Sequence, residues 1–144
     1  MLMDEAARKP KSVLFACTMN AVRSPIAAAL LRASKGREIH VESAGVEAGA
    51  LDPLAVEIMA EIGVALAHRP HRFEDLEDGC FDLIVVLSQE AQNRAQDWAR
   101  TAAVAIEHWQ TADPTAVEGT QEQRRAAYRA VRDTLQRQIA LRFG

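Results

Sequence analysis

The chain has 144 residues, of which 49% are hydrophobic and 26% are charged, so it is long enough for one domain with a full core and too short for two. Its formal net charge is −3, and 14 of its 17 basic residues are arginine, so the chain as a whole offers no field that would attract nucleic acid. No apolar run approaches the length of a membrane span, and the two cysteines lie far apart without metal-ligand spacing. These features favour a cytoplasmic protein without membrane contact, bound metal or other cofactor.

Strands and helices alternate along the predicted fold. Residues 1–11 are mixed in charge and lack the apolar core of a signal peptide, so we expect a flexible tail there, followed by a single domain over residues 12–144. Strands are predicted over residues 13–16, 40–44, 81–87 and 104–107, and helices over residues 24–35, 52–62 and 90–99 and after residue 120. This alternation predicts an α/β fold in which helices cover both faces of a four-stranded parallel sheet.

Local signals mark several helix starts. Thr120 and Gln123 form a capping box for the last helix. Asp52 and Asp113 each precede a proline and follow a predicted strand, so each can cap a helix with proline at the next position. The apolar residues that recur every four positions in the last helix are Ala127, Val131, Leu135 and Ile139.

The most informative motif joins the first strand to the next helix. Cys17 ends the strand, Ser24 is the expected N-cap of the helix, and Pro25 fits at its first position. Backbone N–H groups at a helix start favour a bound anion and a thiolate over a thiol, and the guanidinium of Arg23 can contact two phosphate oxygens. Asn20 stands where a left-handed backbone is tolerated without glycine. The alternative is a buried structural cysteine beside a solvated arginine. The expected phosphate-binding loop consists of Cys17, Thr18, Met19, Asn20, Ala21, Val22, Arg23 and Ser24.

From residue 13 to the C-terminus the chain resembles the low-molecular-weight protein tyrosine phosphatase family, which also contains the thioredoxin-coupled arsenate reductases. The resemblance implies a flavodoxin-like three-layer fold and a metal-independent reaction through a cysteinyl-phosphate on Cys17. Met19 departs from the family pattern, because many members have glycine there, and Val22 stands where the eukaryotic phosphatases carry a second cysteine. The landmarks that follow the family's order are residues 17–25, 43–45, 63–68, 81–88 and 113–114.

The resemblance also implies roles for individual residues. The family's general acid lies in an Asp-Pro pair after the fourth strand, which here is Asp113, and we assign Asp52 to helix capping. For His68, the alternative of a buried histidine satisfied by a backbone carbonyl stays open. The expected catalytic residues are Cys17, Arg23 and Asp113. The expected supporting residues, which hold the loop in shape, are Asn20, Ser24, Ser43 and His68.

Four more residues have structural expectations attached to them. His71 and Arg72 are expected at a solvated rim. Trp98 is expected in the core, whereas Trp109, four residues before Asp113, is a candidate wall of the pocket.

The absence of certain aromatic residues and cysteines helps to narrow the class of substrate. Thr115 and Ala116 follow the Asp-Pro pair where many phosphotyrosine-specific members have tyrosines, residues 46–51 contain no aromatic residue, and residues 43–62 look more like the arsenate reductases. The thioredoxin-coupled route needs two further cysteines, the first of them where Ser88 stands. Cys80 begins the third predicted strand, roughly 20 Å from the ligand edge, so we interpret it as a structural or incidental thiol.

The sequence therefore favours a phosphomonoester hydrolase of the protein tyrosine phosphatase type. Its expected partners are a phosphorylated protein or a small phosphomonoester, together with inorganic phosphate or related oxyanions, and neither nucleic acid nor a membrane. One alternative is an arsenate reductase in which a small external thiol resolves the adduct on Cys17. A second is a phosphate- or phosphopeptide-binding module without turnover, against which the joint presence of Cys17, Arg23 and Asp113 argues. The sequence carries no prediction of oligomeric state.

Overall fold

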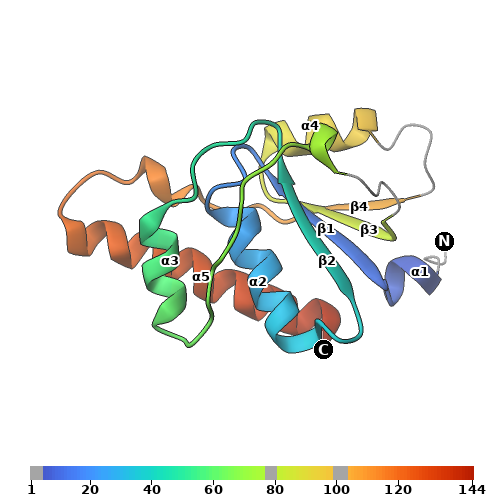
Figure 1. Cartoon of the computed structure of the whole chain (residues 1–144), viewed down its shortest axis with the longest axis horizontal. Coiled ribbons are helices and arrows are strands. Elements are labelled where there is room, and N and C mark those ends of the chain that lie inside the picture. The colour runs from blue at the N-terminus through green and yellow to red at the C-terminus, as the bar shows by residue number, and fades with distance from the viewer. Residues whose placement is uncertain (1–4, 77–80, 99–103) are drawn as a thin grey trace.

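A four-stranded parallel sheet forms the centre of the molecule (Figure 1). The computed structural model describes residues 5–76, 81–98 and 104–144. The strands are β1 (Ser12–Cys17), β2 (His40–Gly45), β3 (Leu83–Val86) and β4 (Ala105–His108), in the order β2-β1-β3-β4 with every neighbouring pair parallel. The predicted fold class is confirmed, and the predicted strand ends differ from the observed ones by at most two residues.

Helices cover both faces of this sheet. Alternate residues of a strand point to opposite faces, so Phe15 and Cys17 join one apolar cluster while Leu14 and Ala16 join another. The first cluster lies under α2, α3 and α5, and the second lies under η1 and α4, as the layers in Figure 1 show. The helical elements are α1 (Glu5–Arg8), α2 (Arg23–Lys35), α3 (Pro53–Ala60), η1 (Phe73–Asp75), α4 (Gln89–Trp98), η2 (Pro114–Ala116) and α5 (Gln121–Phe143).

The start of α2 differs from the sequence-based expectation. Its N-cap is Val22, which makes no side-chain capping bond, and the N–H of Ile26 already donates to the carbonyl of Val22 at 3.0 Å. Ser24 therefore lies inside the first turn, and the prediction that it caps the helix is wrong. The reason is that its hydroxyl contacts the sulfur of Cys17 instead.

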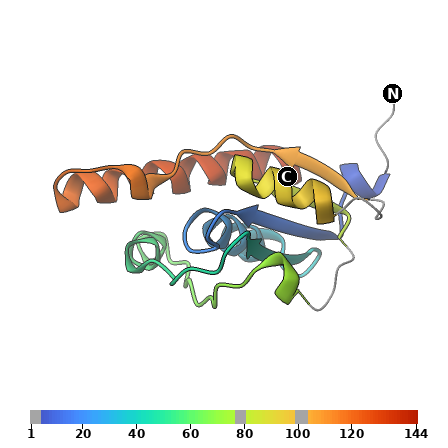
Figure 2. The same cartoon turned by 90° about the horizontal axis from the view of Figure 1, so that it is seen from above.

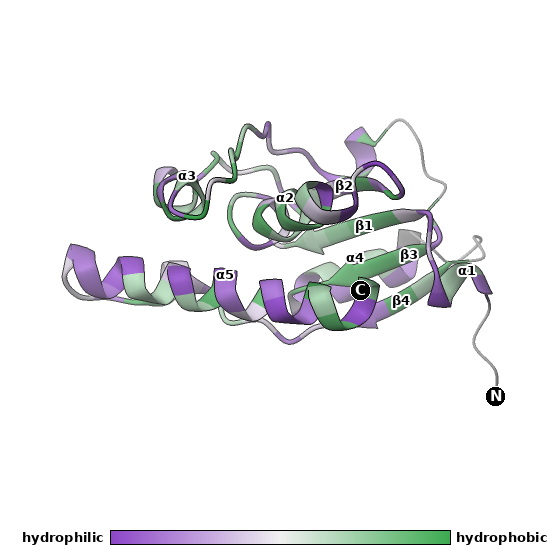
Figure 3. Ribbon diagram, turned by 90° about the horizontal axis from the view of Figure 1, so that it is seen from below, coloured by the Kyte–Doolittle hydropathy of each residue, from purple (hydrophilic) through white to green (hydrophobic). Residues whose placement is uncertain are grey.

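The other predicted caps are confirmed. Asp52 accepts a hydrogen bond from the N–H of Leu54, and Thr120 and Gln123 form their reciprocal capping box at the start of α5. Helix α5 runs along the length of the molecule (Figure 2), and apolar patches interrupt its polar surface (Figure 3). The buried side chains of α5 are Tyr128, Val131, Arg132, Leu135 and Ile139, whereas Ala127 is only half-buried.

The segment expected to be a flexible tail contains the short helix α1. Ala7 is buried, and the guanidinium of Arg142 near the end of α5 donates to the carbonyl oxygens of Ala7 and Arg8. Residues 5–8 are thus attached to the domain. Cys80 and the side chain of Trp98 lie outside the described residues, so the expectations for them stay predictions. Among the described helices, none is long and apolar enough to cross a membrane.

Candidate active site

A pocket of about 840 Å³ opens at the carboxyl ends of the strands. Three residues from different elements line it: Cys17 at the end of β1, Arg23 at the start of α2, and Asp113 just before η2. Ligands of parallel α/β sheets bind at this edge, and the structure brings the three expected catalytic residues together there. Among the described residues, no group of three His, Cys, Asp or Glu side chains is placed to hold a metal ion.

The loop after β1 is held from outside by backbone hydrogen bonds. Residues 46–52 donate N–H groups to the carbonyl oxygens of Cys17, Thr18, Met19 and Ala21 at 2.8–3.3 Å. These carbonyl oxygens are therefore directed toward residues 46–52. Carbonyl oxygens repel an anion and N–H groups attract one, so this arrangement suits a loop that binds phosphate.

Asn20 fixes the shape of the loop from inside. Its backbone has φ 52°, the left-handed conformation that the sequence suggested, and its side chain is fully buried. Its Nδ2 donates to the hydroxyls of Ser24 at 2.8 Å and Ser43 at 3.1 Å. Its Oδ1 accepts from the N–H of His71 at 2.9 Å and lies 2.7 Å from Nε2 of His68. The amide thus uses its full hydrogen-bonding capacity, and it joins three chain segments to the loop.

His68 is neutral in this network. Because Oδ1 of Asn20 can only accept, Nε2 of His68 must carry the hydrogen of that contact. Burial, with smaller contributions from the charges of His71 and Arg32, lowers the pKa of His68 to about 4. The structure therefore places His68 against the loop residue Asn20, and its partner is a side-chain amide rather than a backbone carbonyl.

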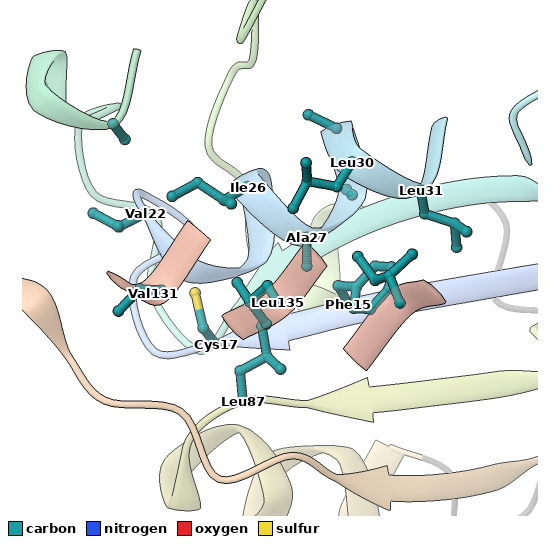
Figure 4. Close-up of a cluster of buried hydrophobic side chains, with 14 of the residues drawn as sticks. Phe15, Cys17, Val22, Ile26, Ala27, Leu30, Leu31, Leu87, Val131 and Leu135 are labelled. Atoms are coloured by element: carbon teal, nitrogen blue, oxygen red, sulfur yellow. The ribbon is translucent and has the colours of Figure 1, made fainter. Parts of the chain in front are cut away.

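The sulfur of Cys17 lies at the meeting point of the loop and the apolar core. The residue is only 2% exposed, and Figure 4 shows its sulfur near Leu87, Val131 and Leu135. Its polar contacts come from Ser24, whose Oγ is 2.9 Å away and whose N–H donates at 3.4 Å. Because Asn20 already donates to Oγ of Ser24, the hydroxyl hydrogen of Ser24 can point to the sulfur at 2.9 Å; its other acceptor, the carbonyl oxygen of Ala44, is farther away at 3.5 Å. A thiolate at Cys17 would thus receive two hydrogen bonds.

Arg23 spans the gap between the loop and the sheet. Its Nη1 donates to the carbonyl oxygens of Leu87, just after β3, and Thr111, after β4, each at 3.2 Å. Within the part of the chain that the structure describes, its other N–H groups take no protein acceptor. The guanidinium is therefore positioned by two backbone carbonyls and retains donors for an oxyanion.

Asp113 and Asp52 both cap helices and both line the pocket. Oδ1 of Asp113 accepts from the N–H and the hydroxyl of Thr115, at 3.0 and 2.6 Å, and the residue is exposed. Oδ2 of Asp52 instead accepts from the hydroxyl of the fully buried Tyr128 at 2.5 Å. Burial and the adjacent Asp52 carboxylate raise the pKa of Tyr128 to about 12, so this phenol stays protonated and donates. Asp113 is thus the carboxyl group that is more accessible to a substrate.

Comparisons with known proteins agree with this geometry. The family described as low molecular weight phosphotyrosine protein phosphatase matches residues 12–141. The chain belongs to this family. The arsenate reductase of Bacillus licheniformis is 33% identical over 132 residues, which cover 90% of this chain and 92% of that relative. The arsenate reductase of Halalkalibacterium halodurans is 35% identical over 130 residues, with coverage of 90% and 92%.

Solved structures of the family superpose on nearly the whole chain. The YwlE arginine phosphatase of Geobacillus stearothermophilus has a TM-score of 0.76 at 25% identity and covers 91% of this chain and 89% of its own. The tyrosine phosphatase AmsI of Erwinia amylovora has a TM-score of 0.72 at 26% identity, with coverage of 92% and 90%. The family thus carries phosphatase and arsenate reductase activities on one fold.

The rim of the pocket is acidic. Thr18 donates from its hydroxyl to Oγ of Ser88 at 3.0 Å and approaches Oε2 of Glu90 at 3.2 Å. Carboxylates of Asp52, Glu90 and Asp113 line the pocket, and none of the described lining residues is Phe, Tyr or Trp. The sequence-based suggestion that Trp109 walls the pocket is wrong. Its ring packs against Phe15 of the core, with centroids 5.8 Å apart, because apolar area is better buried there.

Three features of the site were missed by the sequence analysis. His71, expected at a solvated rim, contributes its backbone N–H to Asn20. Tyr128 holds Asp52 from 76 residues away, which no local pattern signals. Gly45 lies so close to the loop that an added Cβ would be 2.4 Å from the carbonyl oxygen of Glu47 and 2.7 Å from the N of Asn20. The family landmark at residues 43–45 was the available signal for Gly45.

Proposed function

We propose that the protein is a phosphomonoester hydrolase that works through a cysteinyl-phosphate. The observation that carries the proposal is the common pocket of Cys17, Arg23 and Asp113, with the sulfur placed against two donors of Ser24. This set provides a nucleophile, a cation for the phosphoryl oxygens and an accessible carboxyl group. The family relationship supports the same assignment.

The chemistry proceeds in two displacements. The thiolate of Cys17 attacks phosphorus, the S–P bond forms, and the ester P–O bond breaks while protonated Asp113 gives its proton to the leaving oxygen. Water then attacks the phosphocysteine, its proton passes to the Asp113 carboxylate, and the S–P bond breaks to release phosphate and the thiolate. The free N–H groups of Arg23 and the loop amides stabilise the negative charge of the equatorial oxygens in both steps.

The acidic rim bears on the identity of the substrate. A pocket lined by three carboxylates, with no Phe, Tyr or Trp among its described residues, favours a phosphorylated substrate with a positive charge near the phosphoryl group over phosphotyrosine. One structural relative is named an arginine phosphatase, which supports testing phosphorylated arginine as well as aryl phosphates.

A second candidate is an arsenate reductase resolved by a small external thiol. The curated relatives at 33–35% identity carry that name, which favours this alternative. Ser88, which stands where the thioredoxin-coupled enzymes have a resolving cysteine, bonds to Thr18 of the loop. This position therefore carries a hydroxyl, which cannot reduce an adduct on Cys17, so a reductase of this kind would need the external thiol.

The two candidates separate in a pair of assays on the same preparation. The hydrolase is supported if the protein hydrolyses an aryl phosphate, vanadate inhibits this hydrolysis, and the protein does not reduce arsenate in the presence of a thiol. Arsenate reduction that needs a small thiol, without hydrolysis, overturns it in favour of the reductase. Loss of either activity in Cys17→Ser, with an unchanged circular dichroism spectrum, ties the activity to this site. Phosphate binding without any turnover in the wild type supports a binding module instead.

A further inference from the structure

A second cavity is lined by five basic residues, none of which belongs to the active site. The chain has three lysines, Lys9, Lys11 and Lys35, and all three line one groove of about 590 Å³. Arg8 and Arg142 line it as well. This concentration of positive charge contrasts with the formal net charge of −3 for the whole chain. The charge in this groove would therefore attract a polyanion.

This groove lies at the end of the sheet opposite the catalytic pocket. It is formed by the segment between α1 and β1, the end of α2 and the end of α5, which meet near the C-terminus in Figure 1. Lys11 directly precedes β1, and Cys17 ends the same six-residue strand. At about 3.3 Å per residue, roughly 20 Å separates the groove from the nucleophile. The two cavities are thus separate sites.

The lysine ammonium groups are available to a ligand. Lys9 and Lys11 are exposed and Lys35 is half-buried, and none of them forms an ion pair with any residue in the described part of the chain. The two arginines are already engaged, Arg8 with a glutamate of its own helix and Arg142 with Glu107 and with α1. The arginines therefore shape the groove, while the lysines supply free donors.

The groove also has an apolar wall. Pro10, Ile39, Leu141 and Phe143 line it beside the basic residues. Leu141 is 87% exposed, the most exposed of the large apolar side chains that the structure describes. Glu38 and the terminal Gly144 bring negative charge to the lining, and the five basic side chains outnumber them. An apolar wall next to several ammonium groups suits a molecule with an organic body and several anionic groups.

We propose that this groove binds a soluble organic polyphosphate with the chemistry of a nucleoside triphosphate. Its volume lies in the range of pockets that bury small ligands, and its concave form separates it from the flat basic surface that a membrane would need. The lysines contact the phosphates as point charges, and the apolar wall contacts the organic part. The proposal is independent of the reaction at Cys17.

Calorimetric titration with ATP tests the proposal. The titration is carried out without divalent cations and with saturating orthovanadate, which occupies the phosphate loop. We expect one ATP site, whose dissociation constant rises about tenfold in Lys11→Gln and in Lys35→Gln, because each removes one ammonium–phosphate contact. Arg37→Gln is the matched control: it removes the same charge next to the groove, but Arg37 does not line it, so we expect less than about a threefold change.

Three results would overturn the proposal. These are no ATP binding with vanadate present, equal weakening in the lysine and control variants, and binding to vesicles of anionic lipid in place of ATP. Melting temperature and aryl phosphate hydrolysis, both expected to be unchanged in the lysine variants, show that the fold is intact. If the wild type does not hydrolyse the aryl phosphate but its ATP binding still depends on the lysines, the proposed function is refuted and the proposed ATP site in the groove is supported.

Discussion

Asn20→Gly is the change that tests the architecture of the phosphate-binding loop most directly. It removes all four side-chain hydrogen bonds of Asn20, while glycine keeps the left-handed backbone without strain. The buried hydroxyl of Ser43 and the N–H of His71 lose their partner, at about 1–3 kcal/mol each. Ser24 keeps its contact with Cys17, and the half-buried His68 can reach water, so those two bonds cost about 0.5–1 kcal/mol each.

The sum predicts a loss of roughly 3–8 kcal/mol in the free energy of unfolding, a large part of the stability of about 5–15 kcal/mol for a domain of this kind. Asn20→Ala should lose about 1 kcal/mol more, because alanine must adopt φ 52°. Urea unfolding followed by circular dichroism measures both changes. Hydrolysis should fall sharply in both variants, because the loop amides are no longer held in place.

Met19→Gly is the control for the loop. Met19 is 45% exposed and precedes Asn20, and its replacement adds the same backbone freedom without removing a side-chain hydrogen bond. We expect it to cost no more than about 1 kcal/mol. If Asn20→Gly is no more destabilising than Met19→Gly, the network around Asn20 does not hold the loop and the reasoning above is refuted.

Three further variants test the site. Asp113→Asn should slow esters with poor leaving groups by about 10²–10⁴-fold and activated esters much less; equal losses in a leaving-group series would leave Asp113 only its capping role. Arg23→Lys should be nearly inactive, because an ammonium cannot reproduce the paired contacts of a guanidinium, and a turnover number within a few-fold of wild type would place Arg23 outside the reaction. His68 has a folded pKa of about 4, below its usual 6.5, so the unfolded chain binds more protons between these values. Stability should therefore be complete above about pH 6.5 and fall by on the order of 2 kcal/mol as the pH drops to about 4, allowing for the solvent around the half-buried ring. His68→Gln, which keeps a donor for Asn20 but does not titrate, should flatten this dependence in pH-dependent urea unfolding, and an unchanged slope would assign it to other groups.

The parts of the structure that the sequence predicted depend on local patterns. Apolar runs and helix caps specify strands and helix starts within a few residues, so the sheet, the cap at Asp52 and the left-handed Asn20 could all be anticipated. The start of α2 could not, because the hydroxyl of Ser24 had two possible partners; in the folded chain it contacts the sulfur of Cys17, and the helix begins one residue earlier, at Arg23. Choices between such partners depend on distances that only the folded chain defines.

Long-range contacts account for the remaining differences. Tyr128 reaches Asp52 from α5, and Arg142 binds α1 from the other end of the chain. Both contacts join residues separated by at least 76 positions, beyond any helical or strand period. Trp109 likewise packs against Phe15, 94 positions away, although it lies close in sequence to the pocket residue Asp113.

The hydrogen bonds from residues 46–52 to the phosphate-binding loop come from main-chain N–H groups. Side chains over most of this segment can therefore be exchanged in evolution without loosening the loop, as long as the donating positions do not become proline. Residues 49–52 also face the pocket, so the same segment offers variable side chains to the substrate. The loop can therefore keep its shape while the side chains beside it change. Relatives with the same cysteine and arginine can in this way diverge toward different phosphorylated substrates or toward arsenate.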